Sequence, residues 1–384
     1  MASTYKTPGV YREDVYVRPA AVLPTGVPGF VGFGQTSGDI AVLLHRADEL
    51  TDHLTVPPGV DSYLPDAVAG FFANGGVRCY VVGADATGDP EKALTAALAR
   101  LGPLGDLDLV AVPDAMTLTD DEARQRVQRA MLAHCDEHGN RFALLDAPEG
   151  KDPRLDAVEA LKTWRQRLVV GGANPANAAL YYPWVKVFSA DVFGGRAVPP
   201  CGHVAGVFAR SDARVGVFKA PANEALMSVL DLEFAVDAGT QEELNPAGIN
   251  CLRSFPGRGL RVWGARTLSA DPNWRYINVR RLFLTLARWI DRNLAWAAFE
   301  PNLPRLWLRI GRELNVYLGQ LWQAGALKGA TAAEAFYVKC DAETNPPDER
   351  EQGRVTTEIG LAAALPAEFI VARIIHRAGA AQLT

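Results

Sequence analysis

The segment Leu107-Asp108-Leu109-Val110-Ala111-Val112 is a short, mostly apolar run of strand-forming residues, and it is one of a series. Comparable runs occupy residues 79–82, 142–145 and 180–182. Amphipathic helical patterns separate these runs, at about 64–74, 90–101, 119–138 and 153–169. This alternation predicts βαβ units, in which helices cover both faces of a parallel sheet. We expect two further helices in this part, at 203–213 and 222–230.

The composition is that of an ordinary folded protein. The chain has 384 residues, of which 48% are hydrophobic and 22% are charged. These values exclude disordered, collagen-like and disulfide-scaffold classes, and the length predicts two or three domains. The sequence holds neither an uncharged apolar run of membrane-spanning length nor the pattern of a signal peptide. We therefore expect synthesis in the cytoplasm, reduced cysteines and no membrane insertion.

The formal net charge of −5 conceals a segregation of charge along the chain. Residues 246–340 hold twelve arginines, two lysines and five acidic residues, which gives +9 and leaves −14 for the remainder. A basic region of this size predicts an acidic partner, or acidic segments of other copies of the chain.

Two long amphipathic helices are predicted in this basic region, each with arginines on one side. Arg281, Arg288 and Arg292 lie opposite the apolar positions of the first helix. Arg305, Arg309 and Arg312 form a stripe at i, i+4 and i+7 on the second. Each stripe is either a surface for a partner or a solvated helix face.

Both ends of the chain contain strand-like segments that lack an evident partner. Residues 1–25 are rich in proline and glycine and hold one short alternating run. Near the C-terminus, residues 366–384 hold a strongly apolar run, which as an exposed edge strand would favour aggregation. Each run needs a partner strand, either internal or from another molecule. The residues expected to make these contacts are Val10, Tyr11, Val15, Tyr16 and Val17 in the N-terminal segment, and Phe369, Ile370, Val371, Ile374 and Ile375 in the C-terminal one.

The sequence contains few patterns that indicate chemistry. His134 and His138 could share a helix face, but no further metal ligands accompany them, and no phosphate-binding loop or GxSxG elbow occurs. A hydrolase could use His203 with a nearby aspartate and serine, yet a packed histidine is the preferred interpretation. The other candidates weighed for such a site are Asp114, Asp146, Ser189, Ser211 and Ser228. The tryptophans of the basic region, Trp289, Trp296, Trp307 and Trp322, favour core packing over binding of nucleic acid. We therefore predict no catalytic, cofactor-binding or metal-binding residues.

Several segments resemble contractile tail sheath proteins, in the same order along almost the whole chain. The longest and most specific of them runs from Phe255 to Ser269 and continues through 274–282. The other segments that carry the resemblance are 7–11, 142–148, 199–206, 219–223, 299–302 and 366–370.

The resemblance implies a structural sheath subunit of a phage tail or phage-tail-like contractile injection system, without enzymatic activity. It implies hexameric rings stacked around an inner tube, arms that add strands to neighbouring subunits, and partners at the baseplate and terminal cap. Assembly is expected in the cytoplasm of a bacterial cell, followed by action as part of a contractile particle. Arg305, Arg309, Arg312, Arg281, Arg288 and Arg292 are the expected tube-facing residues.

The expected fold is an α/β plus α+β architecture with five parts. An N-terminal arm (1–25) is followed by a small β segment (26–63) that packs with the C-terminal domain. The resemblance implies a non-catalytic, subtilisin-like α/β domain (64–245), inserted before a C-terminal α+β sheath domain (246–365). A C-terminal arm (366–384) completes the chain. The alternative is a subtilisin-related hydrolase.

Overall fold

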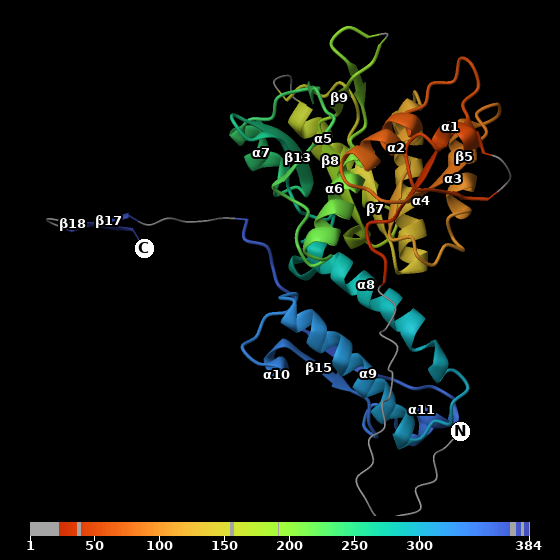
Figure 1. Cartoon of the computed structure of the whole chain (residues 1–384), viewed down its shortest axis with the longest axis vertical. Helices are drawn as coiled ribbons and strands as arrows, with labels where there is room; N and C mark the ends of the chain where they lie inside the picture. The colour runs from red at the N-terminus through yellow and green to blue at the C-terminus, as the bar shows by residue number, and fades with distance from the viewer. Residues whose placement is uncertain are drawn as a thin grey trace, which may run out of the picture.

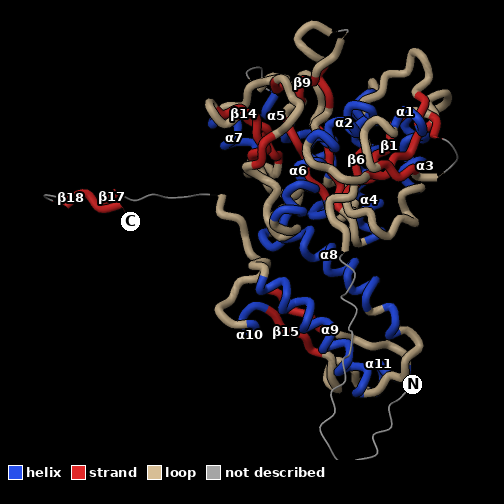
Figure 2. Tube along the Cα trace, in the orientation of Figure 1, coloured by secondary structure: helices blue, strands red, loops and turns tan. Residues whose placement is uncertain are grey.

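The computed structural model describes residues 23–36, 40–153, 157–190, 192–368, 374–377 and 380–383. Figure 1 shows a larger part built around a β-sheet, a smaller and mostly helical part, and the long helix α8 (Ile277–Asn293) running between them. The strands of the larger part gather at its centre, with helices on both sides of them (Figure 2). Within the described residues, no helix has both the length and the apolar character needed to cross a bilayer.

One large sheet organises the larger part, and the described residues contribute nine strands to it. The strands from β13 to β5 run parallel to one another, whereas β3, β14 and β11 are antiparallel to their neighbours at the edges. The predicted parallel sheet is therefore confirmed. In the order of pairing, the strands are β11 (Glu224–Ala225), β14 (Gly259–Trp263), β13 (Ile249–Phe255), β8 (Ala178–Tyr182), β7 (Phe142–Asp146), β6 (Leu109–Ala111), β1 (Pro28–Phe33), β5 (Cys79–Ala84) and β3 (Val42–Leu44).

Helices cover both faces of this sheet, at the positions that the periodicity predicts. On one face, α2 and α6 approach each other so closely that a Cβ atom at Gly202 would lie 2.3 Å from the carbonyl oxygen of Ala67. On the other face, α3, α4 and α5 pack side by side. These helices are α2 (Leu64–Ala73), α3 (Pro90–Ala99), α4 (Asp121–His138), α5 (Ala157–Leu168) and α6 (Cys201–Arg214).

Smaller elements surround the sheet. A three-stranded sheet pairs β10 (Arg196–Val198), β9 (Val185–Val187) and β12 (Asp231–Leu232), and a two-stranded one pairs β2 (Gln35–Thr36) with β4 (Leu54–Thr55). The short helices here are α1 (Leu50–His53) and α7 (Ala238–Leu244). The helix predicted at 222–230 is absent, because Asn223 and Ser228 adopt positive φ angles of 57° and 56°, which a right-handed helix does not accommodate.

The segment 26–63 does not pack with the C-terminal domain as the sequence predicted. Its strand β1 is wholly buried between β5 and β6 at the centre of the large sheet. The continuous apolar run of β1 suits a strand that is covered on both faces, and only the large sheet offers such a place. The predicted boundary at 245/246 also moves, because β13 and β14 belong to the large sheet, which therefore extends to Trp263.

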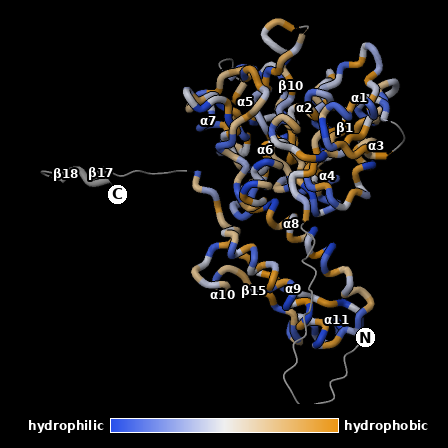
Figure 3. The backbone as a smooth tube through the Cα atoms, viewed as in Figure 1, coloured by the Kyte–Doolittle hydropathy of each residue, from blue (hydrophilic) through white to orange (hydrophobic). Residues whose placement is uncertain are grey.

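The smaller part packs around α8 and α9 (Pro304–Gln323), and its core joins Leu282 and Leu286 of α8 to Leu318 of α9. The rings of Trp289 and Tyr317 stack between the two helices with centroids 4.2 Å apart. The remaining elements are α10 (Ala332–Ala335), β15 (Phe336–Lys339), α11 (Pro347–Glu351), β16 (Glu358–Leu361), β17 (Ile374–Arg377) and β18 (Ala380–Leu383). Along α8 and α9, hydrophobic and hydrophilic positions alternate with the helical turn, as Figure 3 shows.

Candidate assembly surface

Arg281 lies in the interior, so the prediction of an exposed basic face on α8 was wrong at this position. Its side chain is 2% exposed and donates to Asp212 of α6 at 2.9 and 2.6 Å and to Asp108 at 2.9 Å. A guanidinium group holds two carboxylates in this way because its donors are arranged as a rigid fork. Burial raises the pKa of Asp212, and the charge of Arg281 opposes that shift. The cluster fastens α8 to the large sheet.

Arg288 is also buried, against the segment that enters β1. Its Nη2 donates to the carbonyl oxygens of Pro24 at 2.8 Å and Asp106 at 3.1 Å. Asp108 in turn accepts from the backbone N–H groups of Gly26 at 3.0 Å and Val27 at 2.6 Å. Arg288 and Asp108 thus fix the chain where the expected N-terminal arm ends, on both sides of residue 25. Asp108 inside an apolar run was the one sequence signal for this junction.

On α9, the arginines Arg305, Arg309 and Arg312 are exposed, and the apolar side chains of Leu308 and Val316 are exposed among them. We call these five residues the α9 surface. The guanidinium carbon of Arg309 lies 3.4 Å from the ring centroid of Trp296, and its Nε lies 3.4 Å from Glu313 Oε1. Arg305 and Arg312 form no ion pair with the described residues. The surface is both basic and apolar, a combination typical of a binding face.

Two further positions belong to the end of the molecule that carries α9. Arg292 is exposed near the end of α8. Phe299, in the loop before α9, is fully exposed and has a φ angle of 66°, which is strained for a bulky residue. Sequence reasoning did not select Phe299 as a contact residue, because neither periodicity nor charge marks it.

The small sheet of β15 and β16 offers strand edges for pairing. The two strands pair only with each other among the described residues, so each has a free edge. In the C-terminal segment, β17 pairs with β18 over four residue pairs, so this part of the apolar run has an internal partner, one of the two alternatives that the sequence left open. Ile374 and Ile375 lie in β17. The other expected arm contacts, Val10, Tyr11, Val15, Tyr16, Val17, Phe369, Ile370 and Val371, lie outside the described residues.

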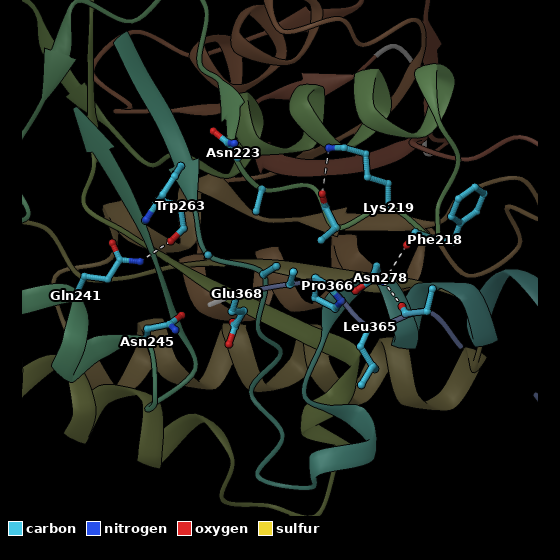
Figure 4. Close-up of a pocket in the computed structure, with 16 residues that line it drawn as sticks. Phe218, Lys219, Asn223, Gln241, Asn245, Trp263, Asn278, Leu365, Pro366 and Glu368 are labelled. Carbon is cyan, nitrogen blue, oxygen red and sulfur yellow. Dashed lines mark hydrogen bonds between the residues drawn. The ribbon is translucent and has the colours of Figure 1, made fainter. Parts of the chain in front are cut away.

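A cavity of about 480 Å³ lies where the chain leaves the smaller part, between β14 and residues 364–368. Figure 4 shows Asn278 of α8 placed between Phe218 and the C-terminal segment, where its Nδ2 donates to the carbonyl oxygens of Phe218 at 2.8 Å and Ala364 at 3.0 Å. Arg266 binds the carboxylate of Glu368 through two hydrogen bonds, at 3.0 and 2.5 Å. These contacts anchor the chain at the start of the expected C-terminal arm, on both sides of residue 366.

The candidate hydrolase residues are not arranged as a catalytic triad. His203 is 1% exposed, and its ring packs so tightly on α2 that a Cβ atom at Gly70 would lie 2.5 Å from it. Its Nδ1 has no hydrogen-bond partner, although a triad requires an acidic residue there, and Ser211 Oγ is buried without a partner too. Burial lowers the pKa of His203 to about 4. Ser189 and Ser228 lie in loops outside the sheet.

Asp114 and Asp146 accept hydrogen bonds from the main chain. Asp114 accepts from the backbone N–H groups of Phe33 and Tyr63 at 2.5 and 2.6 Å, and burial raises its pKa to about 6. Asp146 accepts from the N–H of Cys201 at 2.9 Å, which fixes the start of α6, and burial raises its pKa to about 7. Both carboxyl groups therefore position backbone segments around the sheet.

The shifted pKa of Asp146 predicts a pH dependence of stability. This pKa lies near 7 in the folded protein and at the ordinary value of 3.8 in the unfolded chain, so the folded protein binds the proton more tightly than the unfolded chain does. The resulting stability is complete below pH 3.8 and is lost as the pH rises towards 7. Relative to Asp146→Asn, the wild type should lose up to about 1.4 kcal/mol of folding free energy for each pH unit between about 4 and 7. Denaturant titrations at several pH values measure this difference, and a constant difference would contradict the assignment.

The histidine pair on α4 does not offer a metal site. Nη1 of Arg141 lies 2.9 Å from Nε2 of His134, and the rings of His134 and His138 lie 4.5 Å apart. Burial, followed by the charge of Arg141, lowers the pKa of His134 to about 3. In the part of the chain that the structure describes, no cluster of three or more His, Cys, Asp or Glu residues could hold a metal ion.

Two family models match adjacent parts of the chain. The phage tail sheath protein central domain matches residues 88–268, and the phage tail sheath C-terminal domain matches residues 269–377. The chain belongs to the phage tail sheath family. The boundary between the two models lies after the large sheet ends and before α8 begins. The resemblance seen in the sequence is therefore confirmed, and the family is one of structural sheath proteins.

Individual proteins extend this family match over nearly the whole chain. The anti-feeding prophage sheath in its contracted state is 34% identical, with a TM-score of 0.77, and the match covers 97% of this chain and 100% of that one. The PVC sheath of an extracellular contractile injection system, also contracted, is 30% identical with a TM-score of 0.76, over 98% and 99% of the two chains. A protein described as a prophage major tail sheath protein of Pseudomonas aeruginosa (strain UCBPP-PA14) is 24% identical over 75% of this chain and 74% of its own length. The match to contractile sheath subunits thus includes the α9 surface and both anchored segments.

Proposed function

We propose that this sheath subunit polymerises into stacked hexameric rings around an inner tube, and that contraction of the sheath drives the tube through a target envelope. The match to two sheaths in contracted states along almost the whole chain carries this proposal. The driving force would be a difference in packing free energy between the extended and contracted lattices, so no nucleotide or cofactor is required. In this role the protein is not an enzyme, and the buried His203 with its unpartnered Nδ1 supports that view over the hydrolase alternative.

The residues that contact the tube are the most detailed part of this proposal. The α9 surface is the candidate, because its three arginines are exposed and apolar side chains lie among them. Arg292 remains a secondary candidate for the tube contact. Arg281 and Arg288 are no longer candidates, because both are buried. An acidic tube surface would complement the arginines, set the register of the rings and still permit release, since exposed ion pairs are individually weak.

The arms would connect neighbouring subunits by adding strands to them. Main-chain hydrogen bonds supply the affinity in such contacts, and alternate side chains supply the specificity. The free edges of β15 and β16 support this role as acceptors, and within the described part of the chain β17 and β18 pair only with each other, which leaves each an edge to donate. The anchoring of residues 24–27 and 364–368 supports arms that begin at fixed points.

We infer that the larger part is a subtilisin-like α/β domain without protease activity, because its parallel strands carry helices on both faces. Further partners would be the baseplate and terminal cap proteins of the particle, with neither nucleic acid nor a membrane bound directly. Assembly in the cytoplasm of a bacterial cell would precede incorporation into a phage tail or a phage-tail-like particle.

Reversing the charge of the α9 surface tests the tube contact. The variant Arg305→Glu, Arg309→Glu and Arg312→Glu should still form sheath but should bind tube at least about tenfold more weakly, because each exposed ion pair contributes up to about 1 kcal/mol. The measurement is co-sedimentation of sheath with tube, combined with electron microscopy. The variant with lysine at all three positions keeps the charge and should bind tube as the wild type does. Normal tube binding by the glutamate variant would assign the α9 surface to solvent or to other sheath subunits.

A further inference from the structure

An apolar knob projects from the larger part, at the end opposite α9. It lies on the hairpin between β9 and β10, which extends beyond the neighbouring elements in Figure 2. Phe188 is 79% exposed and Phe193 is fully exposed, and the exposed Leu230 comes from the neighbouring segment, where its backbone N–H donates to Lys186 of β9. Leu230 contacts the hairpin closely, since a Cβ atom at Gly195 would lie 3.0 Å from its Cδ1. We call Phe188, Phe193 and Leu230 the hairpin knob. An exposed apolar cluster of this kind marks an interaction site.

A complementary socket lies elsewhere on the same chain. It is a cavity of about 310 Å³ between α4 and the loop that follows α5. Apolar side chains line it, among them Ala130, Leu132, Ala133, Leu168 and Val169. Arg129 also lines the socket, and its Nη1 donates to the carbonyl oxygen of Arg167 at 3.1 Å. The socket is therefore apolar inside and basic beside its wall.

The topology places the knob and the socket at opposite ends of the parallel strands. The socket loop precedes β8, so it lies at the amino ends of the parallel strands, whereas the hairpin follows β8 and lies at their carboxyl ends. A subunit with complementary sites at opposite ends makes head-to-tail contacts, which generate helical assemblies when they do not close. The exposed Asp231 of β12, the strand paired with β9, has the charge that complements Arg129 and Arg167.

We propose that the hairpin knob of one subunit inserts into the socket of another copy of this chain. The inference rests on the proposed sheath function, because in a sheath the copies around each subunit are identical to it. Phe193 would enter the socket, where burial removes its ring from water, and Asp231 would approach the arginines at the socket. The contact adds a lattice connection that is independent of the arms and of the α9 surface.

A cysteine pair tests this contact in the full chain. In the double variant Phe193→Cys and Ala133→Cys, oxidation of the assembled sheath should produce a ladder of covalent oligomers, since a disulfide forms when the two Cβ atoms come within about 4 Å. The matched control combines Phe193→Cys with Val77→Cys, an exposed position outside the socket in the loop between α2 and β5. Four of the five native thiols are buried, and the wild type oxidised in parallel accounts for Cys340. Assembled sheath without a ladder, or an equal ladder from the Val77 pair, would overturn the proposal.

A second variant measures what the contact contributes. Phe188→Ser with Phe193→Ser should fold with an unchanged melting temperature, because both side chains are exposed, but should yield at least tenfold less sheath than Val77→Ser under the same conditions. Normal yield from the double serine variant would overturn the inference and leave the sheath function intact. A wild type that forms no sheath would instead overturn the proposed function itself. Loss of binding to lipid vesicles with unchanged assembly would assign the knob to a membrane surface and also contradict the proposal.

Discussion

Deletion of residues 369–384 should give a folded subunit that forms no sheath. The deletion removes β17 and β18 but keeps Glu368, whose ion pair with Arg266 anchors the chain before this point. Each hydrogen bond of a donated strand contributes about 1 kcal/mol, and one deletion removes the whole set from every subunit of the lattice. Deletion of residues 1–22 should have the same effect, because Asp108 and Arg288 still hold residues 24–27. Electron microscopy for sheath, with circular dichroism for folding, measures both outcomes.

A point variant separates strand pairing from the mere presence of the arm. Ile375→Pro removes a main-chain donor within β17 and should reduce assembly nearly as far as the deletion does. Ile375→Val keeps the donor and the strand preference, so it should assemble normally. Sheaths of normal length from either deletion would show that the arms are not the connection between subunits.

Substitution of Arg281 by methionine should cost about 3–5 kcal/mol of folding free energy, because Asp108 and Asp212 would then remain buried without their partner. Methionine keeps much of the side-chain volume, so the loss would reflect charge rather than a cavity. Denaturant unfolding at neutral pH measures the change.

Arg292→Met provides the matched control on the same helix. Arg292 is exposed, so its substitution should change stability by no more than about 0.5 kcal/mol. Adding Asp212→Asn to Arg281→Met should recover part of the loss, since Asp212 would no longer be a buried unpaired carboxylate and Asp108 would still face Arg288 at 3.8 Å. Equal effects of Arg281→Met and Arg292→Met would contradict the role of the buried cluster.

The strands and helices of the larger part were predictable because each is long enough to show its own period. The apolar runs at 79–82 and 142–145 lie in β5 and β7, and the periodic stretch at 119–138 gives α4. The segment 222–230 was mistaken for a helix because apolar spacing does not reveal left-handed backbone at Asn223 and Ser228. Local patterns predict elements well where the local backbone is regular.

Placement of charge was harder to predict than placement of strands. Arg288 and Arg292 both lie on α8, yet Arg288 is buried against Pro24 and Asp106, whereas Arg292 is exposed. A helical period identifies a stripe, but only the tertiary contacts decide whether the stripe meets acidic residues or water. The hairpin knob and its socket were missed for the same reason, because they come from loops and helices that are far apart in the sequence.

The position of α8 has a mechanical consequence. Asn278, near its start, holds the chain before the C-terminal arm, and Arg288, ten residues later, holds the chain where the N-terminal arm ends. At a rise of about 1.5 Å per residue, the two anchor points lie about 15 Å apart along one continuous helix. In the proposed lattice, a pull on one arm would reach the other arm along this helix, while Arg281 and Asp108 would pass part of the load to the large sheet. Helix α8 would therefore couple the two arms of each subunit directly in the proposed sheath, and the large sheet would move together with it.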